Sequence, residues 1–322
     1  MESTKEHFLN YRDAVIYPSD LAILDSPTAW LNDACINFQM TRLQQTQDER
    51  RNAAKEDESE QKRQKKGADD GDGERSDLLE DLFIDPSVIS FLVHQLNEDD
   101  EDYDVELSNL NASWKLPQPP TSGHQCINMK KLGKEELHAK KSSQTYQRKR
   151  VFISISDQFA ASRSTFTLPG GGNHWSLLLW EIDTLYYEAE DGFNALVGVG
   201  FHHFDSSRGF NEAAAIVVAK KLHRVLCASM SKNDGVADVV EVLECETPQQ
   251  RNGYDCGIFA LGFADALSAA NEYPFIKEHH EAFLQSHFEE NGGQGDFAPS
   301  LRKRIGDDIR ELAGKAQQKR KR

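Results

Sequence analysis

The segment from Gln250 to Gly257, which reads Gln-Arg-Asn-Gly-Tyr-Asp-Cys-Gly, constrains the fold of this chain more than any other. Cys256 stands directly before an apolar run that extends to Phe263, and this run predicts a buried helix that begins at the cysteine. A thiol at a helix N-terminus feels the positive end of the helix dipole, which favours the thiolate. The alternative interpretation is a small buried cysteine at the start of a core helix.

A cysteine nucleophile requires a base and a group that orients the base. Among eleven histidines, His174 is distinctive because it follows a glycine-rich loop at 169–173 and opens an apolar run typical of a central strand. Asp205 ends the next predicted strand. If the two strands pair as a hairpin, His174 and Asp205 lie at the same end of the sheet. Taken singly, a structural histidine and a turn-forming or helix-capping aspartate are the alternatives.

These motifs, in this order, resemble a known family. The sequence has His-Trp at 174–175, Asp-Ser at 205–206 and Gln-x-Asn-Gly-x-Asp-Cys-Gly at 250–257, which is similar to the Ulp/SENP (adenain-like) cysteine proteases. Those enzymes cleave ubiquitin-like modifiers from their targets. Trp-Leu-Asn-Asp at 30–33 is similar to an entry motif of the same family. The nucleophile comes last in the chain, whereas papain-like enzymes place it first.

The resemblance implies a catalytic set. Cys256 would be the nucleophile and His174 the general base. Asp205 would hold the imidazole in the useful tautomer, and Gln250 would form the oxyanion hole together with the backbone N–H of Cys256. An amide on Gln250, six residues before the cysteine, fits that role.

The resemblance also implies a set of substrate-binding residues. Trp30 and Trp175 would close over the terminal Gly-Gly of a modifier, because only residues without a Cβ fit between two indole faces. Asp33 would contact a basic residue of the modifier. Its alternative role is the N-cap of the helix that follows.

Flanking sequence favours one branch of the family. The strand at 151–156, the Gly-Gly-x-His-Trp-Ser-Leu segment and the alanine-rich helix after 205 look closest to the deneddylases, which act on Nedd (Rub in some eukaryotes). The expected function is therefore a thiol isopeptidase that removes Nedd from conjugates such as cullins, and that also processes the precursor. The alternatives are a SUMO-specific protease and a modifier-binding protein without turnover. We expect no cofactor and no metal site.

Charge and cysteine usage restrict the partners. With 37 basic and 53 acidic side chains, the net charge of −16 disfavours nucleic-acid binding and favours a soluble monomer. Five widely spaced cysteines without a C-x-x-C pair predict a reducing compartment, the cytoplasm or the nucleus. No apolar run approaches the roughly 18 residues that span a bilayer, so no membrane partner is expected.

Polar segments interrupt one catalytic domain, predicted at 1–314. We expect disordered insertions at about 44–80 and 117–150 and an extended loop at 183–199 between paired strands. For the start of the first insertion, the alternative is a solvated continuation of the helix after Asp33, with disorder in the middle of the segment. The basic tail at 315–322 is either a nuclear import signal or a frayed end.

The predicted class is α+β, with the Ulp-type protease fold: a short mixed sheet packed by helices, and a nucleophile at the N-terminus of a core helix. The predicted elements are helices at 33–43, 86–96, 211–227, 256–269, 276–288 and 301–312, and strands at 151–156, 174–182, 200–205 and 238–244.

Overall fold

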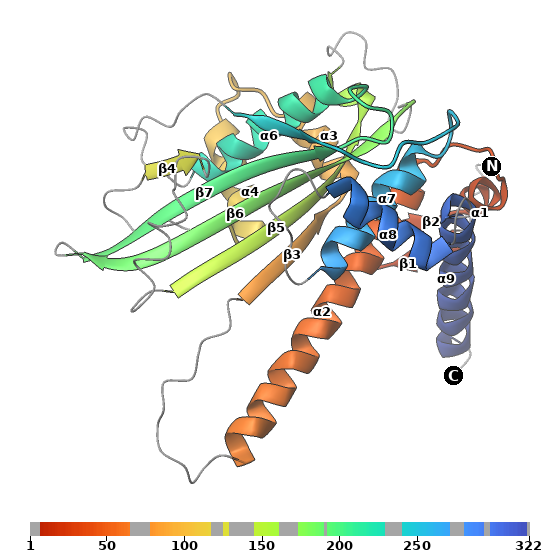
Figure 1. Cartoon of the computed structure of the whole chain (residues 1–322), viewed down its shortest axis with the longest axis horizontal. Helices are drawn as coiled ribbons and strands as arrows, with labels where there is room; N and C mark the ends of the chain where they lie inside the picture. The colour runs from red at the N-terminus through yellow and green to blue at the C-terminus, as the bar shows by residue number, and fades with distance from the viewer. Residues whose placement is uncertain are drawn as a thin grey trace.

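The computed structural model describes residues 7–64, 78–116, 125–128, 145–160, 173–189, 192–228, 240–270, 280–292 and 297–320. Figure 1 shows the arrangement of their elements. In chain order these are β1 (Leu9–Tyr11), β2 (Ala14–Ile16), α1 (Pro18–Asp25), α2 (Asp33–Gln64), β3 (Leu78–Ile84), α3 (Pro86–His94), α4 (Tyr103–Ser113), β4 (Gln125–Asn128), β5 (Thr145–Ser156), the 3-10 helix η2 (Asp157–Ala160), β6 (Trp175–Ala189), β7 (Gly192–Phe204), α6 (Glu212–Cys227), β8 (Val242–Cys245), α7 (Cys256–Ala269), α8 (His280–Gly292) and α9 (Phe297–Arg320).

A mixed sheet of six strands forms the centre of the described chain. Its order is β3-β5-β6-β7-β4, and β8 also pairs with β7. Strands β5, β6 and β7 are antiparallel to one another, whereas β3 pairs parallel with β5. Strands β4 and β8 pair parallel with successive parts of β7. The predicted α+β class with a mixed sheet and flanking helices is confirmed.

Helices cover both faces of this sheet, which explains the apolar run from Leu177 to Trp180 in β6. Leu177 and Leu179 belong to the core on the α7 side, while Leu178 and Trp180 belong to the core on the α6 side. Successive side chains of a strand point to opposite faces, so a strand buried on both faces needs apolar residues at every position. Figure 1 shows α3 and α6 on one side and α7 and α8 on the other.

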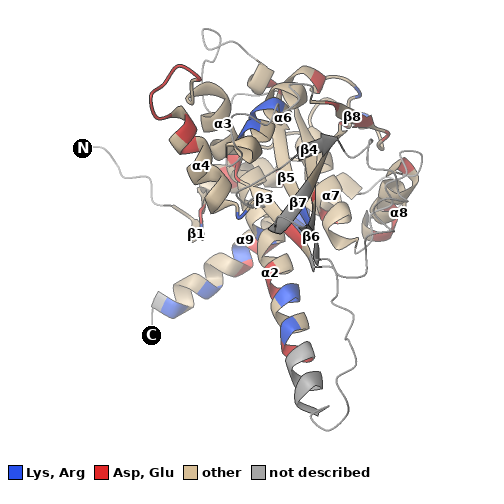
Figure 2. Cartoon of the chain, turned by 90° about the vertical axis from the view of Figure 1, so that its left-hand side faces the viewer, with Lys and Arg blue, Asp and Glu red and all other residues tan. Residues whose placement is uncertain are grey.

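The predicted insertion at 44–80 has regular structure at both of its ends. Helix α2 continues to Gln64, and β3 begins at Leu78. Gln, Glu, Lys, Arg and Ala are strong helix formers, so a segment poor in apolar residues can be an exposed helix as well as a disordered one. Figure 2 shows acidic and basic residues interspersed along α2, which extends away from the sheet. Residues 65–77 lie outside the described residues.

Two further predicted irregular segments contain strands. The insertion at 117–150 includes β4 and the first half of β5, and its other residues, 117–124 and 129–144, lie outside the described part. The loop at 183–199 is instead an extension of the β6–β7 hairpin, in register from Asp183 opposite Gly198 to Ala189 opposite Gly192. Tyr, Val and Leu occur throughout this stretch and favour strands.

The C-terminal elements differ from prediction mainly in their ends. Helix α7 has the predicted bounds, and α8 begins at His280. Helix α9 runs to Arg320, so most of the predicted basic tail at 315–322 is helical. Residues 271–279, 293–296 and 321–322 lie outside the part of the chain that the structure describes. Within the described chain, no helix has the length and apolarity required to span a membrane.

An ion pair buried at the sheet edge anchors the C-terminal end of α7. Asp81 on β3 lies opposite Arg150 on β5, and their side chains form two hydrogen bonds of 2.6 and 2.7 Å. Arg150 also donates to the carbonyls of Leu267 and Ala270, at 2.8 and 3.1 Å. A cation at a helix C-terminus satisfies carbonyls that have no partner in the helix and opposes the negative end of the dipole.

We expect Asp81→Ala to lower the free energy of unfolding by about 3–5 kcal/mol, because it leaves the buried Arg150 guanidinium without its carboxylate. Urea denaturation of the full chain measures this loss. Glu246→Ala is the control, because it removes a carboxylate from an exposed ion pair, with Arg208. Equal, small losses for the two variants would contradict the expectation.

Candidate functional site

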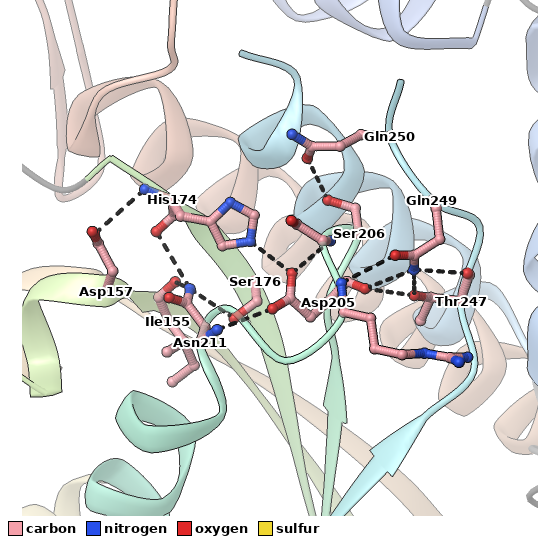
Figure 3. Close-up of polar contacts among 12 residues, drawn as sticks. Ile155, Asp157, His174, Ser176, Asp205, Ser206, Asn211, Thr247, Gln249 and Gln250 are labelled. Carbon is pink, nitrogen blue, oxygen red and sulfur yellow. Dashed lines mark hydrogen bonds and ion pairs between the residues drawn. The ribbon is translucent and has the colours of Figure 1, made fainter. Parts of the chain in front are cut away.

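His174 and Asp205 meet at one end of the β6–β7 hairpin. His174 comes directly before β6 and Asp205 directly after β7, and the register that pairs Leu177 with Phe204 brings them together. The His174 Nε2 and Asp205 Oδ1 atoms are 2.6 Å apart (Figure 3). Both residues are buried, with 4% and 2% of their surface exposed. The structure therefore brings the predicted base and its orienting acid into direct contact.

Cys256 approaches the same imidazole from the first turn of α7. This helix packs on β6, and the cysteine is buried at its N-terminus. The Cys256 thiol lies close enough to the His174 ring to raise the pKa of that ring. Because Asp205 occupies Nε2, the nitrogen left for the thiol is Nδ1. A cysteine, a histidine and an aspartate from three elements thus form one connected set.

The environment of this set favours a charged imidazole. Burial of His174 lowers its pKa, but hydrogen bonds with Asp205 and with the Cys256 thiol outweigh burial and raise the pKa from 6.5 to about 9. Burial raises the pKa of Asp205, yet hydrogen bonds from His174 and the Ser207 N–H hold that pKa below its usual range. An imidazolium beside a thiol stabilises the thiolate, which is the nucleophilic form.

Hydrogen bonds hold Asp205 through both its carboxylate and its backbone carbonyl. Its Oδ1 atom accepts from the Ser207 N–H at 2.9 Å, and Oδ2 accepts from the Asn211 N–H at 3.1 Å. The Asp205 carbonyl accepts from Thr247 Oγ1 at 2.7 Å and from Gln249 Nε2 at 3.0 Å. The orientation of the acid therefore depends on the segment after β8 as well as on the turn after β7.

Asn211 is a site residue that the sequence analysis missed. It was expected only as the start of a helix, and it does precede α6. Its side chain forms no capping hydrogen bond, and its Nδ2 instead donates to the carbonyls of Ile155 and His174 at 3.1 and 3.3 Å, and to Ser176 Oγ at 3.0 Å. An asparagine before a helix usually indicates a cap. The sequence therefore contains no signal for this role.

A second buried imidazole continues the network behind the first. Ser176 Oγ lies 2.8 Å from His203 Nε2, and His203 Nδ1 lies 2.6 Å from Glu244 Oε1. The ring of His203 has no exposed surface. Hydrogen bonds thus connect Asn211, Ser176, His203 and Glu244 from the α6 end of the site to β8, which is consistent with a rigid site.

Gln250 forms hydrogen bonds with Ser206 after β7 and with Asn252 in the loop before Cys256. Its Oε1 accepts from Ser206 Oγ at 2.7 Å, and its backbone N–H donates to the Ser206 carbonyl at 2.9 Å (Figure 3). Its Nε2 donates to the Asn252 carbonyl at 2.6 Å. An amide nitrogen has two N–H donors, so one remains for another acceptor.

A buried ion pair supports the same loop from the C-terminal helix. Asp255, the residue before Cys256, accepts from Arg302 Nη2 at 3.0 Å and from Asn252 Nδ2 at 2.8 Å. Arg302 on α9 also donates to the Ile23 carbonyl at 3.2 Å. The sequence analysis did not predict this contact, because nothing in the order of residues pairs Asp255 with an arginine 47 positions later.

The predicted substrate-binding residues have different environments. Trp30 is 48% exposed, whereas Trp175 is 3% exposed and belongs to the core. The Trp175 indole N–H donates to the Leu31 carbonyl at 3.1 Å, so it supports the segment that bears Trp30. Asp33 lies in the first turn of α2, where burial and the nearby Asp85 raise its pKa.

The alternative role of Asp33 as a helix cap is not observed. Asn32 is the cap instead, because its Oδ1 accepts from the Cys35 N–H at 3.1 Å while its Nδ2 donates to Asp20 at 2.8 Å.

In the described residues, no group of three or more His, Cys, Asp and Glu side chains is arranged to hold a metal ion.

A buried thiol beside an imidazole that a carboxylate orients is the arrangement of a cysteine protease. The model of the Ulp1 protease family, C-terminal catalytic domain, matches residues 128–291, and the chain belongs to this family.

Named relatives agree with this assignment. A probable sentrin-specific protease 8 of Dictyostelium discoideum and the NEDD8-specific protease 1 of Arabidopsis thaliana are 33% and 38% identical over 98 residues. Each of these alignments covers 30% of this chain and 33% of the relative, so the chain matches about a third of the length of each. The sentrin-specific protease 8 of Homo sapiens is 24% identical over 277 residues, 86% of each chain.

A comparison with solved structures gave an alignment over nearly the whole chain. The crystal structure of a de-sumoylating protease covers 96% of this chain and 91% of its own, at 13% identity and a TM-score of 0.49.

The pKa of His174 predicts how stability depends on pH. Because the folded pKa lies above the unfolded value, the stabilisation is fully present below pH 6.5 and is lost as the pH rises through about 9. We expect the difference in unfolding free energy between the wild type and His174→Gln to fall by roughly 3 kcal/mol between pH 6 and pH 9.5. Urea denaturation at several pH values measures it, and a difference independent of pH would contradict the assigned ion pair.

Proposed function

We propose that this protein is a thiol isopeptidase that cleaves after the terminal Gly-Gly of the ubiquitin-like modifier Nedd. The observation that supports catalysis is the connected set of Cys256, His174 and Asp205. The choice of modifier is supported by the relatives named NEDD8-specific protease 1 and sentrin-specific protease 8. Conjugates of Nedd with cullins are the proposed substrates, and maturation of the Nedd precursor uses the same chemistry.

The first step forms a thioester. The Cys256 thiolate attacks the carbonyl carbon of the terminal glycine and forms a C–S bond, which gives a tetrahedral oxyanion. The C–N bond then breaks, and the His174 imidazolium gives its proton to the departing lysine amine. Asp205 keeps the ring oriented and stabilises its positive charge.

The second step releases the modifier. A water molecule gives a proton to His174 and attacks the thioester carbon; the C–S bond then breaks. The products are the modifier carboxylate and the free cysteine. The second N–H of the Gln250 amide and the backbone N–H of Cys256 are the proposed donors to the oxyanion in both steps.

Recognition of the tail uses the exposed Trp30. Its indole provides an apolar wall beside the nucleophile, and residues without a Cβ fit most easily against it. Asp33, in the first turn of α2, is the proposed contact for a basic residue of the modifier. Trp175 contributes to this surface through its hydrogen bond to the Leu31 carbonyl.

Substitution of the catalytic set should separate the three roles. Cys256→Ala and His174→Ala are each expected to lower kcat/KM by about 10⁴-fold or more, since they remove the nucleophile or the proton donor. Asp205→Ala should retain roughly a hundredfold more activity than either. Hydrolysis of a fluorogenic modifier substrate measures the series. Each variant is also melted, because Asp205 orders the turn that ends at Asn211. Undiminished turnover in Cys256→Ala would reject the mechanism.

A panel of modifiers tests the substrate assignment. Nedd, SUMO and ubiquitin, each with a fluorophore amide at the Gly-Gly terminus, are offered to the same enzyme preparation. We expect kcat/KM to be highest for Nedd. Faster cleavage of SUMO would reject the deneddylase assignment and support the SUMO-protease alternative. Failure to label Cys256 with a Gly-Gly vinyl probe would indicate a binding protein without turnover.

A further inference from the structure

An exposed aromatic ring packs against the candidate catalytic base. The Phe210 ring centroid lies 4.7 Å from that of His174, with the two planes tilted by 53°. Phe210 is 59% exposed, which is the highest value among the large hydrophobic side chains exposed in the described part of the chain: Val15, Tyr17, Trp30, Val105 and Phe210. An exposed phenyl ring that packs against the candidate base is in position to contact a ligand that reaches this base.

The turn that bears Phe210 is fixed at both ends. The Phe210 N–H donates to the Ser207 carbonyl at 3.0 Å, and the next N–H, of Asn211, donates to Asp205 Oδ2 at 3.1 Å. Gly209 has a φ of +78°, a conformation that a residue with a Cβ rarely adopts. The ring is therefore displayed on an ordered turn, and binding against it requires little further loss of backbone freedom.

The segments that bear Trp30 and Phe210 lead to opposite faces of the sheet. Leu31, the residue after Trp30, packs in the core on the α7 side, where its Cβ would lie 3.0 Å from a Cβ added at Gly257. Phe210 leads into α6, which packs on the other face. The Phe210 ring lies against His174, the group that protonates the leaving nitrogen in the proposed mechanism, so the leaving group is the part of the substrate that comes nearest to this ring.

The proposed proton transfer fixes what comes near Phe210. His174 protonates the leaving nitrogen, so that nitrogen must come within about 3 Å of the imidazole. The carbon next to it then reaches the ring that covers the imidazole. In an isopeptide, this carbon begins the four-methylene side chain of the acceptor lysine.

We propose that Phe210 binds the methylene chain of the acceptor lysine and so favours isopeptide bonds over other amides of the same modifier. This inference rests on the proposed function. The ring supplies an apolar wall for a flexible alkyl chain, and the ordered turn positions that wall beside the proton donor. Phe210 is thus a specificity residue for the leaving group rather than for the modifier.

Two substrates that differ only in the leaving group test the proposal. The modifier that the wild type cleaves fastest is joined through its terminal glycine either to the Nε of a lysine peptide or to methylamine. Both amides present a nitrogen to His174, but only the first has the methylene chain. We expect Phe210→Ala to lower kcat/KM about tenfold for the lysine conjugate and less than about twofold for the methylamide. Phe210→Leu should lie between the wild type and Phe210→Ala.

Val105→Ala is the matched control, because Val105 is an exposed apolar residue on α4. It should leave both rates unchanged. Equal losses on both substrates in Phe210→Ala, together with a shifted pH profile, would show that the ring acts only by shielding His174 and would overturn the proposal. Unchanged cleavage of both substrates would also overturn it. Failure of the wild type to cleave either substrate would instead reject the proposed function, and the inference with it.

Discussion

The contact between His174 Nε2 and Asp205 Oδ1 depends on the alignment of β6 with β7. Neither residue belongs to a strand, so each is positioned by the last ordered pairs of the hairpin. A register slip of one residue would exchange the faces of every side chain along β7 and move Asp205 away from the imidazole. The long hairpin contributes to function in this sense, because each added pair makes a slip more costly. The covered apolar faces on both sides specify the same alignment.

Behind the two residues, a polar interior keeps them oriented. Asn211 donates to the carbonyls of Ile155 and His174, and Ser176 connects it to His203 and then to Glu244. Buried polar groups are costly unless they are paired, and paired groups in a low-dielectric interior hold one another in place. The fold itself therefore sets the geometry of the candidate site, and preorganised groups of this kind are the condition for strong electrostatic stabilisation of a transition state.

The sequence predicted the parts of this site that leave a local signal. An apolar run after Cys256 gave the bounds of α7, and a glycine-rich loop before an apolar strand singled out His174. The signal was ambiguous for the polar segment after residue 43, the first part of which belongs to helix α2. Composition alone does not separate an exposed helix from a disordered chain. The partners of Asn211 were also inaccessible, since side-chain contacts between distant segments follow from packing and not from local pattern.

Helix α7 is secured by an arginine at each end. Arg150 holds the carbonyls at its C-terminus, and Arg302 holds Asp255 immediately before its N-terminus. The second arginine comes from α9, beyond the segment 128–291 that defines the family match. The structure that supports the candidate site is thus larger than the segment that matches the family. Helix α9 contributes no proposed catalytic group, but its Arg302 holds the residue before Cys256 in place. A change in α9 would therefore affect the thiol through this one guanidinium.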